Sequence, residues 1–580
     1  MKKLIALLLA LVMVVGVLAA CNNTKPVETQ PKETKPAETQ PKETEPAGPV
    51  ENETPLNVAW YSKSGAATKF DNPQWDMSLT IAYEMIWERA TEWDNVNGVR
   101  VYTIAESITS NADFTEFTIK LRNGIKWHDG SEVTIEDYIF SLYYHMLNPA
   151  TASTAMQYVE GYEACKNGET KTMSGVTVDV ANNSATFKLT QGFWDFESNL
   201  GGIVLLPAKY FEGISWAECD NAEFWQKPIG CGPYQIVDVK FPDYFTLTRF
   251  DDYFGAPAGI KNVNVVNYVN SADAMATALM TGNLDFVNRT AIADQATADM
   301  ITAYNANAKI LAISGHGVRC WFFNLGDRAD GDTKPDLQKK EVRQAFDILL
   351  DETQVADLVG ATSSATLVRS NSYDYYKEAD ARVYDVAAAK ALLDSVGFDY
   401  SRTYKIAYYY NEAAVHDAHL LIQQLFAAAG VNVEYELLQG DLGGLLYTTK
   451  NYDLCMLMCT AKDVTPGSNY EKMRSTTSYT FMAVKNGEPK QSDYLIYHDD
   501  RGVTAGWDAL YGSYETEADA TKRAEISKQM QAKNFDECYA LPGYIQATYV
   551  GWNEANVFIP EEDFAYGGDN YQWDQWKILK

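Results

Sequence analysis

One close pair of histidines stands out among the residues that could do chemistry. His416 and His419 are three residues apart in a stretch with helical periodicity. At that spacing two side chains lie on one face of a helix, an arrangement that suits a metal ion. No cysteine or carboxylate joins them at ligand spacing, because Asp417 lies on another face. We therefore predict two helix-surface histidines, with no metal site and no cofactor.

Signatures of catalysis are missing from the sequence. It contains no Gly-x-Ser-x-Gly, no His-Glu-x-x-His and no Gly-x-x-x-x-Gly-Lys-Ser/Thr motif. Its 78 acidic residues make carboxylate pairs so common that no pair indicates an acid–base site. We predict a binding protein rather than an enzyme. The competing classes are a lipid-anchored hydrolase of peptides or glycans and a receptor that senses a peptide.

The N-terminus has the features of an export signal that ends at a cysteine. Two lysines precede the uncharged apolar run Leu4 to Ala20, which is short for a transmembrane helix and is followed by Cys21. Leu18-Ala19-Ala20-Cys21 resembles the bacterial lipobox. That resemblance implies cleavage of residues 1–20 and lipidation of Cys21, which anchors the mature chain in a membrane. An ordinary secretory signal and an uncleaved anchor are the alternatives.

Residues 21–55 are predicted to form a disordered tether. A ten-residue Pro/Thr/Glu/Lys-rich unit begins at Lys25 and again at Lys35, without an aromatic residue. Such a segment buries too little apolar surface to offset its ordering entropy. At about 3 Å per residue, it spans up to roughly 100 Å. A spacer of this kind favours a Gram-positive cell wall.

The remaining residues are too many for a single hydrophobic core. The formal charge of -30 argues against nucleic acid and against electrostatic docking on anionic lipid. Strands predicted at 56–61, 114–121, 246–249 and 263–268 alternate with helices, and a further strand, helix and strand follow between 404 and 438. Helices are predicted at 77–93, from Thr134, at 272–281 and at 342–350. This alternation indicates α/β lobes, and ligand sites prefer the clefts between such lobes.

Six motifs in order carry a resemblance to a known family. The first is Leu121-Arg122-Asn123-Gly124-Ile125-Lys126-Trp127-His128-Asp129-Gly130, with Val133 to Ser141 after it. The others are Pro228 to Tyr234, Ala278 to Asp285, Phe323-Asn324 leading into Glu341 to Ala345, Tyr384 to Leu393, and Tyr452-Asp453-Leu454. Together they are similar to the oligopeptide-binding (extracellular family 5) solute-binding proteins of ABC transporters.

The resemblance implies a two-lobed, periplasmic-binding-protein-like α/β fold with a two-segment hinge. Lobe 1 would be discontinuous, and it would comprise residues 56–75, 200–319 and 545–580. A subdomain at 76–199 would be inserted in it, and lobe 2 would comprise 320–544. The chain would cross between the lobes near 319–324 and near 540–544.

The resemblance also implies the site residues. Peptide-binding members hold the ligand's α-ammonium on an aspartate that follows a cysteine, which here indicates Asp463 after Cys459. Asp463 lies four residues past the cysteine, where about two are expected, so a surface aspartate paired with Lys462 is the alternative. Trp60, Trp75 and Trp321 fall where cleft walls are expected, and Asn324 begins the second lobe.

Two cysteine pairs remain as alternatives to free thiols. Some relatives place a pair where Cys320 and Cys459 stand, which would link the hinge to the site loop. Cys219 and Cys231 are another candidate pair.

The ligand and partners follow from the same resemblance. We expect short peptides, with oligosaccharides and then chelated metals as alternatives. The expected partners are the permease and ATPase subunits of an ABC importer and, through the lipid, the outer face of the cell membrane.

Overall fold

The computed structural model describes residues 52–580 apart from a set of short segments. Those segments are 62–66, 75–80, 95–98, 149–155, 269–270, 289–290, 314, 316, 327, 370–371, 373, 411, 441, 443, 461–465, 474–505 and 566–570. Residues 52–580 form one compact unit. Within the described residues, no helix is long and apolar enough to cross a membrane.

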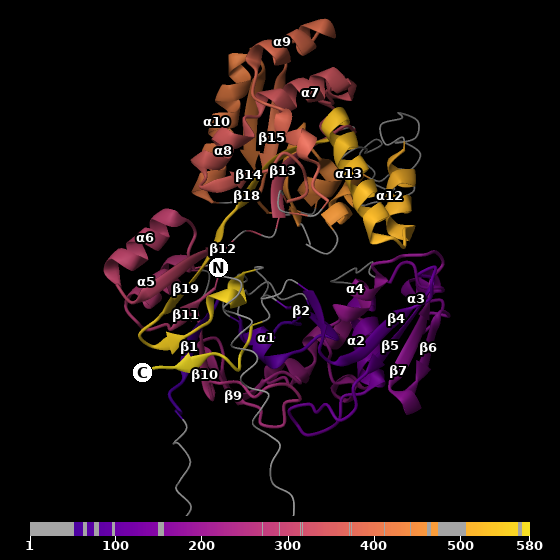
Figure 1. Cartoon of the computed structure of the whole chain (residues 1–580), viewed down its shortest axis with the longest axis vertical. Coiled ribbons are helices and arrows are strands. Elements are labelled where there is room, and N and C mark those ends of the chain that lie inside the picture. Colours follow the sequence, from indigo (N-terminus) through magenta and orange to yellow (C-terminus); the bar gives the residue numbers. More distant parts are fainter. Residues whose placement is uncertain are drawn as a thin grey trace, which may run out of the picture. The chain divides into compact units, whose positions relative to one another are not determined.

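The larger of two central sheets has seven strands. In spatial order they are β12 (Ala308–Ile313), β19 (Thr548–Asn553), β11 (Phe286–Val287), β1 (Leu56–Trp60), β10 (Asn262–Asn267), β9 (Tyr244–Arg249) and β8 (Tyr234–Lys240). β1 runs parallel to β10 and β11, whereas β19 is antiparallel to both β11 and β12. Helices α5 (Ala272–Met280) and α6 (Gln295–Tyr304) pack beside β11, β12 and β19 (Figure 1).

The second central sheet has six strands. In spatial order they are β14 (Ala361–Ser363), β18 (Ala540–Gln546), β13 (Gly317–Phe323), β17 (Leu454–Thr460), β15 (Thr403–Tyr408) and β16 (Asn432–Leu437). Its helices are α7 (Lys340–Leu349), α8 (Glu352–Leu358), α9 (Val386–Ser395), α10 (Ala413–Ala428), α12 (Trp507–Thr516) and α13 (Ala520–Glu537). The apolar face predicted for α7 is confirmed, since Val342, Phe346 and Leu349 are buried.

A third sheet is four-stranded and antiparallel. Its order is β4 (Ala105–Ser110), β5 (Glu116–Leu121), β7 (Ser184–Lys188) and β6 (Val176–Asp179), and its helices are α2 (Ile135–Leu147), α3 (Tyr162–Lys166) and α4 (Phe196–Gly201). The predicted cap of α2 is confirmed, because Thr134 and Asp137 bond reciprocally in a capping box. Two further antiparallel strand pairs are β2 (Thr91–Asp94) with β3 (Val99–Tyr102) and β20 (Val557–Phe558) with β21 (Lys577–Ile578).

The helix predicted over 77–93 is wrong from Trp87 onward. In the described part of that range, 81–93, the structure has the short helix α1 (Ala82–Ile86), and the chain is extended from Trp87 and then pairs β2 with β3. The Pro228–Tyr234 turn packs closely against the end of α1. A Cβ on Gly230 would lie 1.8 Å from the carbonyl oxygen of Ile86, so only glycine permits this approach of the Pro228–Tyr234 turn.

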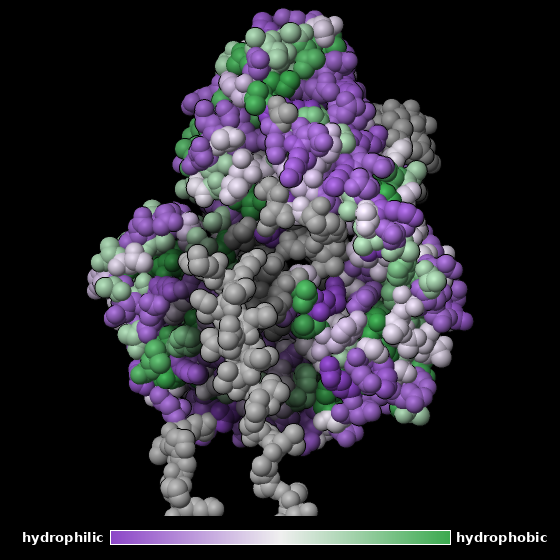
Figure 2. All heavy atoms as spheres, viewed as in Figure 1, coloured by the Kyte–Doolittle hydropathy of each residue, from purple (hydrophilic) through white to green (hydrophobic). Residues whose placement is uncertain are grey.

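The apolar residues gather in four buried clusters, one of them around the six-stranded sheet. On the face shown in Figure 2, hydrophilic and hydrophobic side chains are interspersed. One cluster packs on the six-stranded sheet and another on the seven-stranded sheet, so each central sheet has its own core.

Candidate functional site

The two central sheets are joined by two short connections. The first leads from the end of β12 to the start of β13 across residues 314–316, and the second leads from β18 to β19 across Ala547 alone. The edge of each sheet that these connections reach is called the crossing edge below. Because β13 and β18 are antiparallel to one another and β15 runs parallel to β17, the crossing edge of the six-stranded sheet holds the start of β13 and the ends of β15, β17 and β18. Carboxyl ends of parallel strands are the usual ligand side of such sheets.

Arg319 is the cation of this crossing edge. It lies on β13 opposite Met458 of β17 and Tyr544 of β18. Its guanidinium stacks on the ring of Tyr410, 4.0 Å from the ring centroid, and Nη2 donates to Glu412 Oε1 at 3.0 Å. The residue is only 8% exposed, yet Nη1 has no hydrogen-bond partner among the described residues.

Other polar groups at the crossing edges are also unsatisfied. Gln546 Oε1 and Thr548 Oγ1 flank the second connection, and Asn267 Oδ1 lies at the end of β10 in the seven-stranded sheet. All three atoms are buried without a partner in the described part of the chain. Buried polar atoms are normally satisfied, so these exceptions call for an explanation, although others lie elsewhere in the described residues. A ligand that supplies donors and acceptors would provide one.

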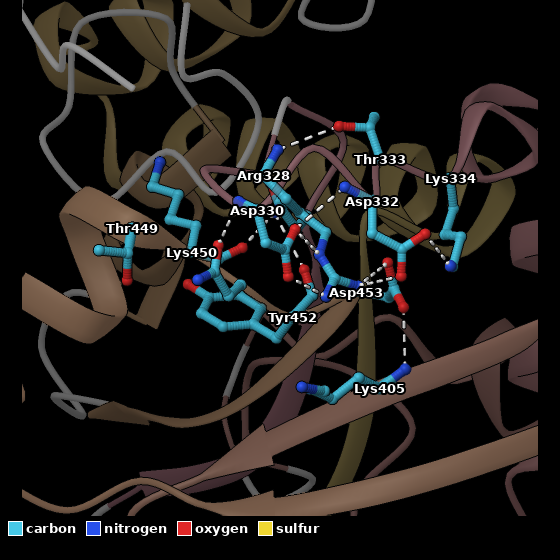
Figure 3. Close-up of polar contacts among 12 residues, drawn as sticks. Arg328, Asp330, Asp332, Thr333, Lys334, Lys405, Thr449, Lys450, Tyr452 and Asp453 are labelled. Atoms are coloured by element: carbon cyan, nitrogen blue, oxygen red, sulfur yellow. Dashed lines mark hydrogen bonds and ion pairs between the residues drawn. The ribbon is translucent and has the colours of Figure 1, made fainter. Parts of the chain in front are cut away.

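A second polar cluster lies at the opposite edge of the six-stranded sheet (Figure 3). Arg328 bonds Asp330 at 2.7 Å and Asp453 at 3.1 Å, and the other oxygen of Asp453 accepts the Lys405 backbone N–H at 2.8 Å. Burial lowers the pKa of Lys450 to about 7 and raises that of Asp453 to about 6. Arg328, Asp330 and Asp453 satisfy one another, so we assign the cluster to the scaffold.

Asn324 belongs to this second cluster. Its Nδ2 donates to the backbone oxygens of Lys450 and Tyr452, both at 3.0 Å, and the side chain is buried. The expectation that Asn324 contacts ligand is therefore not supported. The amide instead ties the end of β13 to the turn before β17.

The predicted tryptophans lie in the core. Trp60 is 1% exposed and packs on Phe70 and Phe245. Trp321 is also 1% exposed, and its Nε1 donates to His419 Nε2 at 3.2 Å. Both rings are buried, and Trp60 Nε1 has no hydrogen-bond partner among the described residues. That the two tryptophans form cleft walls stays a prediction. Trp75 and Asp463 lie outside the described residues.

The two histidines His416 and His419 differ in their exposure to solvent. His416 is exposed, whereas His419 is buried, with Nδ1 bonded to the Val415 carbonyl at 2.7 Å. Because Nε2 accepts from Trp321, the ring is a neutral tautomer, and burial lowers its pKa to about 4. The prediction of two surface histidines is thus wrong for His419. Both of its nitrogens are occupied, and no three-residue metal cluster occurs in the described residues.

Cys320 and Cys459 are neighbours across β13 and β17. Their sulfur atoms lie 3.5 Å apart, in hydrogen-bond contact and beyond the ~2.05 Å of a disulfide. The predicted proximity is present without a bond, and the disulfide stays a prediction. Cys459 is fully buried, which does not support direct contact with ligand. Cys219 and Cys231 belong to different core clusters and carry no disulfide.

Sequence reasoning missed Arg319 and the unsatisfied groups near Ala547. The available signal was a single cation in the otherwise apolar strand Val318 to Phe323, one residue before Cys320. Gln546 and Thr548 carried no such signal, because polar residues between strands are common in any sequence.

Comparison with known proteins identifies the family of this chain. The family model of bacterial extracellular solute-binding proteins, family 5 Middle, matches residues 101–481. The chain belongs to this family. It is 26% identical over 410 residues to the oligopeptide-binding protein AppA of Bacillus subtilis, covering 68% of this chain and 67% of AppA. It is 24% identical to the oligopeptide-binding protein OppA of Lactococcus lactis over 307 residues, 49% of this chain and half of OppA.

A solved relative agrees in fold. The substrate-binding protein CtaP of Listeria monocytogenes superposes with a TM-score of 0.71 at 18% identity, covering 91% of this chain and 100% of CtaP. The predicted two-lobed, mixed α/β fold is thereby confirmed. The inserted subdomain and the two-segment hinge stay predictions.

Proposed function

We propose that this family 5 protein captures short peptides between the two crossing edges and delivers them to the permease and ATPase of an ABC importer. The observation that carries the proposal is the set of buried, unsatisfied polar atoms on Arg319, Gln546, Thr548 and Asn267. An extended peptide offers alternating N–H donors and C=O acceptors, which can satisfy such groups whatever its side chains are. The matched AppA and OppA are named for oligopeptide binding.

Asp463 is the proposed partner of the peptide's α-ammonium. It follows the end of β17 at Thr460 by three residues, and that end lies on the crossing edge. A carboxylate gives an ammonium a charge-assisted hydrogen bond, which strengthens on enclosure. Trp75 is a further aromatic proposed to line the site.

Peptide binding and the role of Asp463 can be tested together. Mass spectrometry of ligand released from a natively purified sample should identify peptides, recovered uncleaved. Asp463→Asn should weaken binding of a free peptide by about 1.5–3 kcal/mol, and N-acetylation of the peptide should cost a similar amount. The two losses should not add, because each removes the same ion pair. Calorimetric titration measures all four combinations.

A matched control is Asp399→Asn. Asp399 is exposed and, in the described part of the chain, bonds its neighbours Ser401 and Arg402 near the start of β15, away from the crossing edge. It should leave peptide affinity unchanged. Binding of cello- or xylo-oligosaccharides or of a metal chelate alone would refute the peptide proposal, and ligand cleavage would favour the hydrolase class.

The proposed site of action is the outer face of the cell membrane, through a lipid on Cys21. Cys21→Ala removes the sulfur that would carry the diacylglycerol, so the variant should appear in the culture medium of the native host. The wild-type chain should sediment with membranes after a carbonate wash. Retention of the variant in that pellet would show instead that the apolar N-terminal run is an uncleaved anchor.

A further inference from the structure

Two residues beside the four-stranded sheet, Tyr158 and Trp194, are held in fixed positions. The backbone N–H of Thr190, just after β7, donates to the Tyr158 carbonyl at 2.7 Å. The backbone N–H of Phe193 donates to the Phe114 carbonyl at 3.1 Å, and the rings of Phe193 and Tyr158 meet edge to face with centroids 5.3 Å apart. Tyr158 and Trp194 therefore belong to one edge of this sheet.

Both residues contact the helices of the six-stranded sheet. The Tyr158 hydroxyl donates to Glu515 Oε1 at 2.8 Å, and the Trp194 backbone N–H donates to the Glu515 carbonyl at 3.0 Å. The Trp194 ring meets the ring of Tyr514 edge to face at 5.9 Å. The guanidinium of Arg523, on α13, stacks on the same indole, 4.0 Å from the ring centroid. Hydrogen bonds and ring contacts thus join this edge to the end of α12 and the start of α13.

The four-stranded sheet and its helices are fixed to the seven-stranded sheet. The backbone N–H of His128 donates to the Gly230 carbonyl at 2.9 Å, and its ring Nε2 lies 3.0 Å from the Gly232 carbonyl oxygen, just before β8. Tyr144 of α2 is a member of the core cluster of the seven-stranded sheet. These two sheets therefore form one body.

Trp194 links this body to the lobe of the six-stranded sheet. It packs against the hydrophobic cluster of that sheet, whose other members among the described residues lie between Cys320 and Tyr544. The two central sheets are joined by the short connections at 314–316 and Ala547. Rotation of the lobe about these connections would carry Glu515 away from Trp194, so the contact has to break when the lobes separate.

The contact contains groups that gain hydration when it breaks. Trp194 Nε1 is buried without a hydrogen-bond partner in the described part of the chain. A buried N–H in that state costs free energy that water would return. Glu515 is only 4% exposed, and its carboxyl group is likewise hydrated once it is released. Because these costs offset the contacts made, one substitution should shift the balance between joined and separated lobes.

We infer that Tyr158 and Trp194 on one side and Tyr514, Glu515 and Arg523 on the other form a latch that closes the two lobes on each other. The latch goes beyond the proposed function, because its contacts are made within the chain whatever the ligand is. Its consequence for a peptide rests on that function. A peptide held between the lobes would leave only after the latch opens, so the latch would slow release.

Hydrogen exchange of the Trp194 amide tests the latch in the full-length protein freed of ligand, because this N–H is bonded to Glu515 only while the latch is closed. Tyr158→Phe removes the hydroxyl that bonds Glu515, and Trp194→Ala removes the ring but keeps the amide. Each should speed exchange at residue 194 by about 3- to 10-fold, the worth of one hydrogen bond or ring contact, with exchange in β13 unchanged. Small-angle scattering should give both variants a larger radius of gyration than the wild type.

Tyr102→Phe is the matched control. The Tyr102 hydroxyl donates to Glu197 Oε1 at 2.7 Å, between β3 and α4, so this variant loses a similar bond outside the latch. It should match the wild type in both measurements. Unchanged exchange at residue 194 in both latch variants, or faster exchange without a larger radius of gyration, would overturn the latch. Failure of any peptide to bind would overturn the proposed function and leave the latch standing.

Discussion

Arg328→Met is expected to destabilise the protein by about 3–5 kcal/mol, measured by denaturant unfolding followed by tryptophan fluorescence. The side chain is 4% exposed and is the cation shared by Asp453, which is 1% exposed, and Asp330 (Figure 3). Removal of one partner from a buried ion pair leaves an uncompensated charge, and that accounts for the size of the effect. Asp332, 3.7 Å from the same guanidinium, is exposed and keeps its 2.6 Å pair with Lys334, so it adds little to the loss.

Two further variants test whether the unpaired buried carboxylate causes the destabilisation by Arg328→Met. In Arg328→Met combined with Asp453→Asn, the buried charge is gone while the Asn oxygen can still accept from Lys405, so part of the loss should be recovered. Lys120→Met breaks a solvent-exposed pair with Glu106 and should cost no more than about 1 kcal/mol. If Arg328→Met proves as mild as Lys120→Met, the cluster is not part of the scaffold, and its polar groups become free for a binding role.

The sequence predicted the elements whose signals are local. The alternation at 114–121, the cap at Thr134 and the apolar face of 342–350 each depend on residues a few positions apart, and β5, α2 and α7 confirm them. The helix predicted over 77–93 failed because its second half pairs as strand. β2 bonds to β3 a few residues later, Arg89 bridges to the distant Val204, and neither partner can be read from the periodicity.

The site was harder to predict because burial is a property of the whole fold. Trp60, Trp321 and Asn324 were chosen for chemistry that suits a cleft, yet the same residue types fill cores and tie turns, and here they do. The burial and the contacts of Arg319 depend on the packing of β13, β18 and α10, which the sequence alone does not give. A lone cation in a strand is otherwise taken for a surface residue, and its unsatisfied nitrogen exists only in three dimensions.

The second large effect concerns Glu88 and pH. This carboxyl is 7% exposed and accepts a 2.6 Å hydrogen bond from Tyr253, and burial, followed by the charge of Glu92, raises its pKa to about 8. The folded state therefore holds a proton that the unfolded chain releases near pH 4.5. Stability from this group is fully present below about pH 4.5 and is lost as the pH rises through 8.

Other buried groups titrate in the same range and shape the total profile. Burial lowers the pKa of His128, His145 and His419 to about 4, so these residues add stability as the pH rises toward 6.5. The pKa of Lys450, lowered to about 7, adds stability at higher pH. The difference between a Glu88 variant and wild type removes these common contributions, because distant sites add independently.

Glu88→Gln is accordingly expected to stabilise the protein at pH 9 and to have little effect at pH 4.5. Glutamine keeps an oxygen for Tyr253 and has no proton to lose, so the variant avoids the cost of a buried carboxylate. At 1.36 kcal/mol per pKa unit, the gain at pH 9 is roughly 3–5 kcal/mol relative to pH 4.5. Glu106→Gln, at an exposed pair with Lys120, should show no such pH-dependent difference. Parallel unfolding curves for wild type and Glu88→Gln from pH 4.5 to 9 would mean that Glu88 is ionised throughout, held by Arg89, whose guanidinium already pairs with Glu84 and Glu92.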